Sequence, residues 1–196
     1  MRKLKFSRVQ KFFKEYLVDS GYKENTIRLK MQHFEVIRDY FNRQHPGLDD
    51  FRDIKLKQAK DFLKHLAEVI SEKTGRLYSS RTRVGIFAAL KLIFRSLYLS
   101  EQIIVNPLHD FTLHAKGGQV HKQIMSEEEI ARFLDNIDTG SLLGMRDRAL
   151  FELIYSSGLR VSEASKLDIE DLDCENRLLR IRQSKWDKDR IVPVSE

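Results

Sequence analysis

Four stretches within the first 99 residues carry apolar side chains at intervals of three and four, and this spacing constrains the fold more than any other feature. Residues spaced in this way share one face of an α-helix, so each stretch predicts an amphipathic helix. Gly21 ends the first helix, Asn25 caps the start of the second, and Asn106-Pro107 follows the fourth. Together the helices predict a compact bundle with one shared core; they cover residues 7–17, 26–41, 54–69 and 82–99.

The charge of the chain is divided unevenly between its two halves. The net charge is +6, but residues 1–122 carry 24 Lys and Arg against 13 Asp and Glu, which gives +11, whereas residues 123–196 carry 11 against 16, which gives −5. Two halves of opposite charge predict two domains. A helical domain rich in Lys and Arg favours a polyanionic partner, because neutralised phosphates supply most non-specific affinity for nucleic acids. The alternative is a basic protein that has no such partner.

Cysteine content and hydropathy exclude several classes of protein. The single cysteine, Cys174, excludes an internal disulfide framework, and the six histidines show no zinc-ligand spacing with it, so no metal is expected. No stretch approaches the ~20 apolar residues of a membrane span, and the basic N-terminus has no apolar signal core. We therefore expect a cytoplasmic protein that has no contact with a membrane.

The spacing of apolar residues changes from helical to strand-like after Leu167. Helices are predicted for residues 126–134 and 140–157, and a further short one begins near Leu159. Beyond Leu167, strands are predicted at 168–172, 178–182 and 191–194, with a polar hairpin loop at 184–190, which gives a small antiparallel sheet. Residues 109–123 lack any sustained period and separate the two halves as a linker.

Arg160 occupies a position that folding alone does not favour. Gly158 allows the preceding helix to end in a left-handed turn, so Arg160 is expected in the first turn of the next helix. A cation there opposes the helix dipole by about 0.3–1 kcal/mol. A phosphate at this point would meet free backbone N–H groups and a planar guanidinium, and Glu163, one turn on, could orient that guanidinium. The alternative is a solvated Arg160–Glu163 ion pair worth ~0–1 kcal/mol.

The residues around Arg160 resemble a known family. The run Gly158-Leu159-Arg160-Val161-Ser162-Glu163, preceded by Arg146-Asp147-Arg148-Ala149-Leu150 and followed by Leu167 and Asp171-Leu172-Asp173, resembles the start of the catalytic domain of the tyrosine recombinases. This family is also called the phage integrase family, and the resemblance is strongest to its Xer type. Upstream, Thr82-Arg83 through Phe94 with Asn106-Pro107-Leu108 is similar to the last helix of the core-binding domain of the family, and Tyr22-Lys23-Glu24-Asn25-Thr26-Ile27 to the start of its second helix.

The resemblance implies a mainly α fold in two domains. Residues 1–108 are expected to form a four-helix core-binding (SAM-like) domain, residues 109–123 an inter-domain linker, and residues 124–196 an incomplete α+β catalytic domain with the small antiparallel sheet. The His-x-x-Arg pair, the further His or Trp and the nucleophilic Tyr that complete the family pattern have no match in the chain. The chain is therefore expected to be a truncated recombinase that is inactive by itself.

The implied activity is site-specific DNA recombination or integration, in which strands are cleaved and rejoined through a 3′-phosphotyrosyl intermediate without a cofactor. The resemblance gives Arg160 and Lys185 catalytic roles and Glu163 a supporting role. Lys185, on the hairpin loop, would protonate the 5′-oxygen leaving group, and Trp186 stands where the family usually has glycine. The expected partner is double-stranded DNA, bound by a homo- or hetero-tetramer of the full-length protein.

Basic side chains of the first half that are expected to be exposed are candidates for phosphate contacts: Lys23, Arg28, Lys30, Arg81, Arg83 and Lys91. The alternative for each is a solubilising surface charge. Two other functions remain open for the chain as a whole. One is a non-catalytic DNA-binding or regulatory protein on a recombinase-like scaffold, and the other is a type IB topoisomerase.

Overall fold

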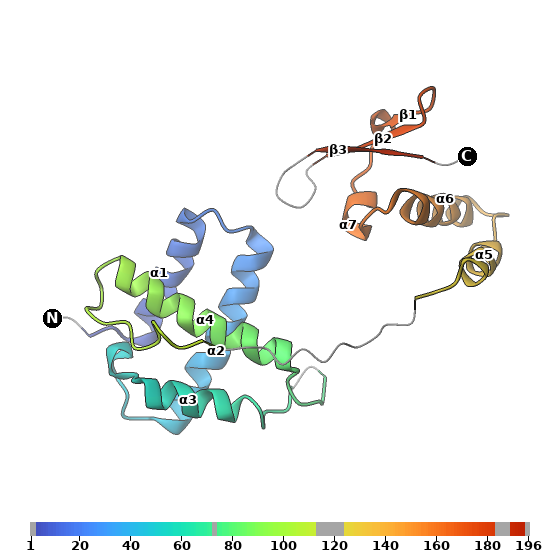
Figure 1. Ribbon diagram of the computed structural model, residues 1–196. Helices are drawn as coiled ribbons and strands as arrows, with labels where there is room; N and C mark the ends of the chain where they lie inside the picture. The colour runs from blue at the N-terminus through green and yellow to red at the C-terminus, as the bar shows by residue number, and fades with distance from the viewer. Residues whose placement is uncertain (1–2, 72–73, 113–123, 183–188, 195–196) are drawn as a thin grey trace. The chain divides into compact units, whose positions relative to one another are not determined.

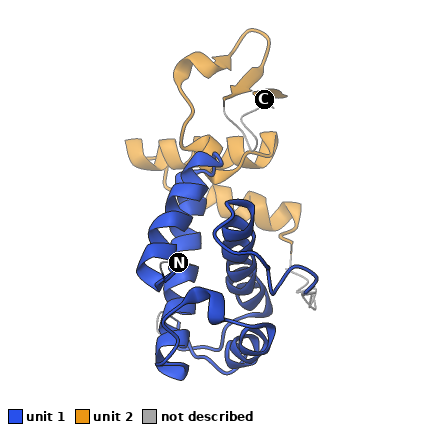
Figure 2. Ribbon diagram, turned by 90° about the vertical axis from the view of Figure 1, so that its left-hand side faces the viewer, with its two compact units in different colours: residues 1–119 blue, residues 120–196 orange. Residues whose placement is uncertain are grey.

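The computed structural model describes residues 3–71, 74–112, 124–182 and 189–194. The chain divides into two compact units, unit 1 with residues 1–119 and unit 2 with residues 120–196 (Figure 2). The expected linker spans the division between them, and its residues 113–123 lie outside the described residues. Among the residues that the structure describes, no helix combines the length and the apolar character that a membrane crossing needs.

The described part of unit 1 contains the four helices that the apolar spacing predicts (Figure 1). Helix α2 packs against both α1 and α4. A short 3₁₀ helix, η1, precedes α3. The bounds are Phe6–Asp19 for α1, Glu24–Gln44 for α2, Phe51–Asp53 for η1, Leu56–His65 for α3 and Ser80–Leu99 for α4.

Several predicted helix boundaries differ from the observed ones, and two of the differences have a clear physical reason. Helix α2 begins before Asn25, with Lys23 as its N-cap residue, and the Asn25 side chain instead accepts a hydrogen bond from Nη2 of Arg28 at 2.9 Å. Helix α3 ends at His65, four residues before the predicted end, because the backbone continues in tight turns and then forms a β-bridge between Ile70 and Leu77. The predicted end of α1 is confirmed, since Gly21 has a left-handed φ of 72°.

Aromatic side chains fill the core of unit 1, as their inward positions predict. Each buried phenylalanine stabilises the fold by about 1.5–3 kcal/mol relative to its exposed state. Rings from the N-terminal segment, η1 and α4 meet, with centroids 5.3 Å apart for Phe6 and Phe51 and 4.9 Å apart for Phe51 and Phe94. The phenylalanines buried completely are Phe13, Phe34, Phe41, Phe51, Phe62, Phe87 and Phe94.

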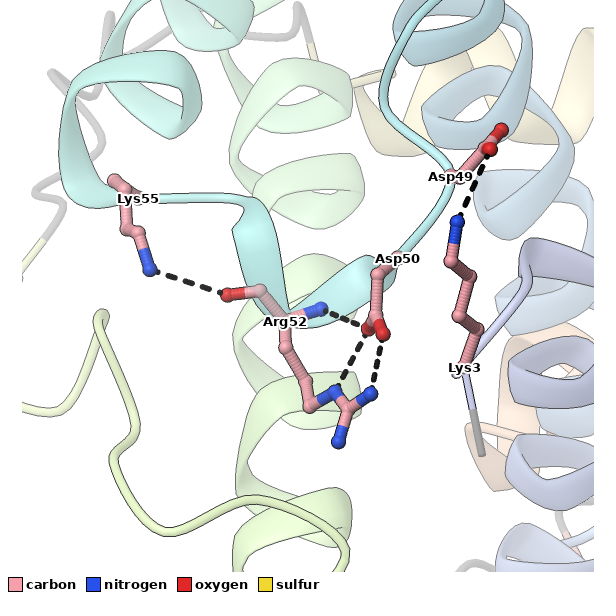
Figure 3. A network of polar contacts seen from close by, with 5 residues as sticks. All are labelled: Lys3, Asp49, Asp50, Arg52 and Lys55. Carbon is pink, nitrogen blue, oxygen red and sulfur yellow. Dashed lines mark hydrogen bonds and ion pairs between the residues drawn. The ribbon is translucent and has the colours of Figure 1, made fainter. Parts of the chain in front are cut away.

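A buried carboxylate organises the connection between α2 and α3 (Figure 3). Asp50 accepts the backbone N–H of Arg52 at 3.1 Å and Nε of the same arginine at 2.8 Å, and it also accepts Nη2. These hydrogen bonds from Arg52 lower the pKa of Asp50 from 3.8 to about 2. The neighbouring pair of Asp49 with Lys3, at 3.4 Å, is exposed. The buried pair therefore fixes η1, whereas the exposed pair adds little.

We expect Asp50→Ala to destabilise unit 1 by about 1–3 kcal/mol, because Arg52 loses both side-chain bonds and η1 loses its cap. Urea unfolding of the chain followed by circular dichroism measures the change. Asp49→Ala is the matched control and should reduce the free energy of unfolding by less than about 1 kcal/mol.

The stabilisation by Asp50 should depend on pH. Since folding lowers the pKa of Asp50, its contribution to the free energy of unfolding is complete above about pH 4 and is lost as the pH falls towards 2. A difference between the wild type and Asp50→Ala that stays constant from pH 5 to pH 2 would contradict this account.

The described part of unit 2 contains three α-helices and a 3₁₀ helix, followed by a small antiparallel sheet (Figure 1). Strand order is β1-β2-β3, with Leu172 opposite Leu179 and Arg180 opposite Ile191. The mainly α fold with a small antiparallel sheet is thus confirmed. The described elements are α5 (Glu127–Asp135), α6 (Leu142–Ser157), α7 (Val161–Ala164), the 3₁₀ helix η2 (Ile169–Asp171), β1 (Leu172–Asp173), β2 (Leu178–Ile181) and β3 (Arg190–Pro193).

The prediction of a strand at 168–172 is largely wrong. Residues Ile169–Asp171 form η2, because the Asp168 side chain caps the N–H of Ile169 at 2.8 Å and the Asp171 carboxylate accepts the N–H of Asp168 at 3.1 Å. Only Leu172 and Asp173 pair with β2. Local side-chain hydrogen bonds of this kind compete with strand formation.

The core of unit 2 is small. Its buried apolar side chains are Leu159, Ala164, Leu179 and Ile181, and neither α5 nor α6 has a fully buried residue in the described structure. Phe133 of α5 and Phe151 of α6 meet edge to face, with ring centroids 5.0 Å apart, while both remain partly exposed. Partly buried apolar side chains complete this core, among them Leu150, Leu153 and Ile154 of α6.

Candidate active site

Arg160 lies between two helices of unit 2. Helix α6 ends at Ser157, and its C-cap residue, Gly158, has a left-handed φ of 61° as predicted; the N–H of Leu159 then donates to the carbonyl of Ile154 at 3.2 Å. Arg160 follows as the N-cap residue of α7. The prediction that it lies in the first turn is wrong, because its backbone is still extended, with φ −79° and ψ 147°. Helix α7 is a single turn of four residues.

Glu163 accepts two hydrogen bonds from Arg160. Its Oε2 accepts the backbone N–H of Arg160 at 2.8 Å, and its Oε1 accepts Nη1 at 2.6 Å. The backbone N–H that was expected to meet a phosphate is thus already used. The Glu163 side chain is only 5% exposed, whereas that of Arg160 is 54% exposed. Glu163 is therefore a buried support beneath a half-exposed guanidinium rather than one partner of a solvated surface pair.

A second arginine binds the same carboxylate. Arg190, the first residue of β3, donates Nη1 to Oε1 of Glu163 at 2.9 Å and Nη2 to Oε2 at 2.8 Å. This bidentate pair joins α7 to the sheet across 27 residues of sequence. Sequence reasoning missed this role of Arg190. The only signal was its place among the basic positions that follow Lys185.

The charges of this cluster, Arg160, Glu163 and Arg190, are strongly coupled. Hydrogen bonds from Arg190, followed by those from Arg160, lower the pKa of Glu163 from 4.5 to about 2, although burial acts in the opposite direction. Glu163 in turn raises the pKa of Arg190. The carboxylate is therefore ionised at neutral pH, and two guanidiniums with one carboxylate carry a net charge of +1. Such a site favours an anion over a neutral ligand.

A similar pair holds the other strand of the hairpin. Arg182, which follows β2, donates Nε at 2.5 Å to Asp171 of η2, whose side chain is 3% exposed. On the exposed side, Arg180 pairs with Asp189 at 2.9 Å. The strands on both sides of residues 183–188 are thus tied by ion pairs. Lys185, the expected general acid, lies outside the described residues.

The six expected phosphate contacts of unit 1 differ in exposure. Lys23, Arg28 and Arg81 are exposed, as predicted. The expectation of exposure is wrong for Lys30, Arg83 and Lys91, which are half-buried because α2 and α4 pack together and a later segment covers part of α4.

The three half-buried residues of this set differ in their surroundings. Burial lowers the pKa of Lys30, and the charge of Lys30, after burial, lowers the pKa of His33. Arg83 has a buried Nε without a hydrogen-bond partner among the described residues. Lys91 donates to the carbonyl of Phe111, which anchors the segment after α4. Within the described ranges, no three His, Cys, Asp or Glu side chains gather as a metal site.

Comparisons with known proteins agree with this fold. Residues 123–196 match the model of the phage integrase family. The chain is 29% identical over 180 residues to tyrosine recombinase XerC 2 of Ralstonia nicotianae, covering 92% of this chain and 51% of the relative. It is 42% identical over 118 residues to tyrosine recombinase XerC of Myxococcus xanthus, covering 60% and 39%.

A solved structure shows the same architecture. The XerH site-specific recombinase bound to palindromic difH substrate, a post-cleavage complex, matches with a TM-score of 0.66 at 23% identity, over 97% of this chain and 53% of that chain. Residues 123–196 match the phage integrase, or tyrosine recombinase, family, and the chain as a whole is similar to Xer-type members of that family. It spans about half the length of the first curated relative and less of the second.

Proposed function

We propose that the chain forms the part of a site-specific recombinase that binds duplex DNA and holds one phosphodiester for strand cleavage and rejoining. The observation that carries this proposal is the half-exposed guanidinium of Arg160 on the buried carboxylate of Glu163. This cluster carries a net positive charge and lies in the segment that matches the family model. The basic first half, at +11, is proposed to supply most of the affinity for DNA.

The proposed chemistry needs a positive charge that is already in place. When a tyrosine attacks phosphorus, negative charge grows on the non-bridging oxygens, and a fixed guanidinium stabilises that charge by several kcal/mol without reorganising. Lys185 is proposed to donate a proton to the departing 5′-oxygen. The product is a 3′-phosphotyrosyl bond, which stores the energy for rejoining.

The nucleophile is proposed to lie outside residues 1–196. Five of the six tyrosines belong to unit 1, and burial raises the pKa of one of them, Tyr40. The sixth, Tyr155 on α6, has no hydrogen bond to the Arg160 cluster within the described structure. Strand exchange between two duplexes requires four cleavages, so the proposed assembly on DNA is a tetramer of like or unlike subunits.

The DNA-binding part of this proposal is tested by removing the exposed candidates together. We expect the triple variant Lys23→Ala, Arg28→Ala, Arg81→Ala to bind duplex DNA about tenfold more weakly near 0.1 M salt, because three phosphate contacts are lost. Fluorescence anisotropy across a salt series should also show a slope of log K against log salt that is shallower by about three.

The matched control removes three other exposed charges of unit 1, with Lys14→Ala, Lys57→Ala and Arg95→Ala in one chain. This variant has the same net charge as the test variant and should retain a larger share of the affinity. Equal losses in the two variants would show that only the total charge matters, and would remove Lys23, Arg28 and Arg81 from the proposed interface.

A further inference from the structure

The carboxylate of Glu163 accepts more guanidinium hydrogen bonds from Arg190 than from Arg160. Arg190 uses two Nη groups on the two oxygens, at 2.9 Å and 2.8 Å, whereas the guanidinium of Arg160 donates only Nη1, at 2.6 Å, to any described residue. The fork-to-fork geometry of Arg190 is the stronger arrangement, because both donors of the planar guanidinium match both oxygens. Arg160 therefore keeps its Nε and Nη2 donors available.

The neighbouring carboxylates do not compete for Arg190. Asp189, next in the chain, pairs with Arg180, and the buried carboxylate of Asp171 pairs with Arg182. The side chain of Arg190 is 32% exposed, compared with 54% for Arg160. Of the two guanidiniums on Glu163, Arg160 is thus the one with exposed donors, while both Nη groups of Arg190 are engaged.

We propose that Arg190 is a positioning residue: by holding both oxygens of Glu163 it limits this carboxylate to one side-chain hydrogen bond with Arg160, whose Nε and Nη2 donors stay open to a phosphate. The inference rests on the proposed function for its purpose, but the competition between the two arginines can be measured without DNA. Arg190 itself touches no phosphate in this account.

Removing Arg190 should change the state of Arg160. With Arg190→Gln, the cluster loses one positive charge, and Glu163 can offer both oxygens to the adjacent guanidinium of Arg160. The pair then becomes neutral, and the donors that faced solvent turn to the carboxylate. In the double variant Arg190→Gln, Glu163→Gln, no carboxylate remains to capture Arg160, so its donors are free again.

The test uses ¹⁵N-arginine-labelled full chain and NMR of the guanidinium groups. In the DNA-free wild type we expect slower Nη rotation for Arg190, which is held by two Nη hydrogen bonds, than for Arg160, which is held by one, and in Arg190→Gln slower rotation for Arg160 than in the wild type. A short mixed-sequence duplex should shift the Arg160 Nε signal in the wild type and leave that of Arg190 in place. Half-saturation of the Arg160 shift should need about five- to tenfold more DNA in Arg190→Gln and should need less DNA in the double variant than in Arg190→Gln, because the capturing carboxylate is gone, although Arg160 then lacks its support.

Other outcomes separate this inference from the proposed function. Two results would overturn the positioning role even where DNA binds normally. One is Arg160 rotation that is no slower in Arg190→Gln than in the wild type, and the other is an Arg190 NMR signal that shifts on addition of DNA as the Arg160 signal does. If Arg160 is captured in Arg190→Gln but never responds to DNA in the wild type, the competition holds and the proposed phosphate site fails. If Arg190→Gln does not fold, Arg190→Lys keeps the charge without the fork, and Arg160 must then rotate more slowly than in the wild type.

Discussion

Arg160→Ala should reduce DNA cleavage by about 10²–10³-fold, because a preorganised donor to the charge of the transition state is lost. The measurement needs the proposed tyrosine, so residues 1–196 are joined to the segment of the Ralstonia nicotianae relative that follows its match to this chain. Cleavage is scored as a covalent protein–DNA adduct on a nicked suicide substrate. DNA affinity should change little, since the interaction strengthens mainly in the transition state.

Two variants of the same chimaera control this experiment. Arg180→Ala removes another exposed arginine of unit 2, one that pairs with Asp189, and should leave the cleavage rate within a few-fold of the parent. Lys185→Ala should regain much of its rate on a substrate with a bridging 5′-sulfur, which departs without a proton, whereas Arg160→Ala should not. Equal rescue of both variants would remove the general-acid role from Lys185. Unchanged cleavage in Arg160→Ala would remove the proposed site.

The affinity of unit 1 for duplex DNA should fall by at least about 40-fold between 50 and 200 mM salt. Each neutralised phosphate contributes about 0.9 to the slope of log K against log salt, so three contacts give this value and six give about 10³-fold. Residues 1–119 and 120–196 are measured separately, because the chain divides between them. Equal binding by the acidic second unit would contradict the assignment of DNA affinity to unit 1.

The sequence predicts the helices of unit 1 well because each one repeats its apolar spacing over several turns. Helix ends are less predictable. Asn25 has the chemistry of a cap, but α2 starts earlier, and its first residue, Glu24, suits the positive end of the helix dipole equally well. The end of α3 depends on the bridge of Ile70 to Leu77, a contact that no local pattern reveals.

In the candidate site, too, the contacts between residues close in sequence could be predicted, whereas those between distant residues could not. Arg160 and Glu163 are three residues apart, so their pairing follows from helical spacing, and it is confirmed at 2.6 Å. Arg190 reaches Glu163 from a strand 27 residues away. Lys91, expected at a DNA surface, is half-buried, and its Nζ donates a hydrogen bond to the carbonyl of Phe111, 20 residues on. Partners set by tertiary folding cannot be found from spacing.

The small core of unit 2 has a consequence for how mutations accumulate. In unit 1, where seven phenylalanines are completely buried, substitutions at apolar positions should be removed first by selection. In unit 2 of this chain, apolar positions such as Leu142 and Phe151 are exposed, whereas Glu163 and Asp171 are buried carboxylates that tie α7 and η2 to the sheet. A random-mutagenesis library should therefore show unit 2 tolerating changes of hydrophobicity at exposed positions such as Leu142, while rejecting the loss of either carboxylate.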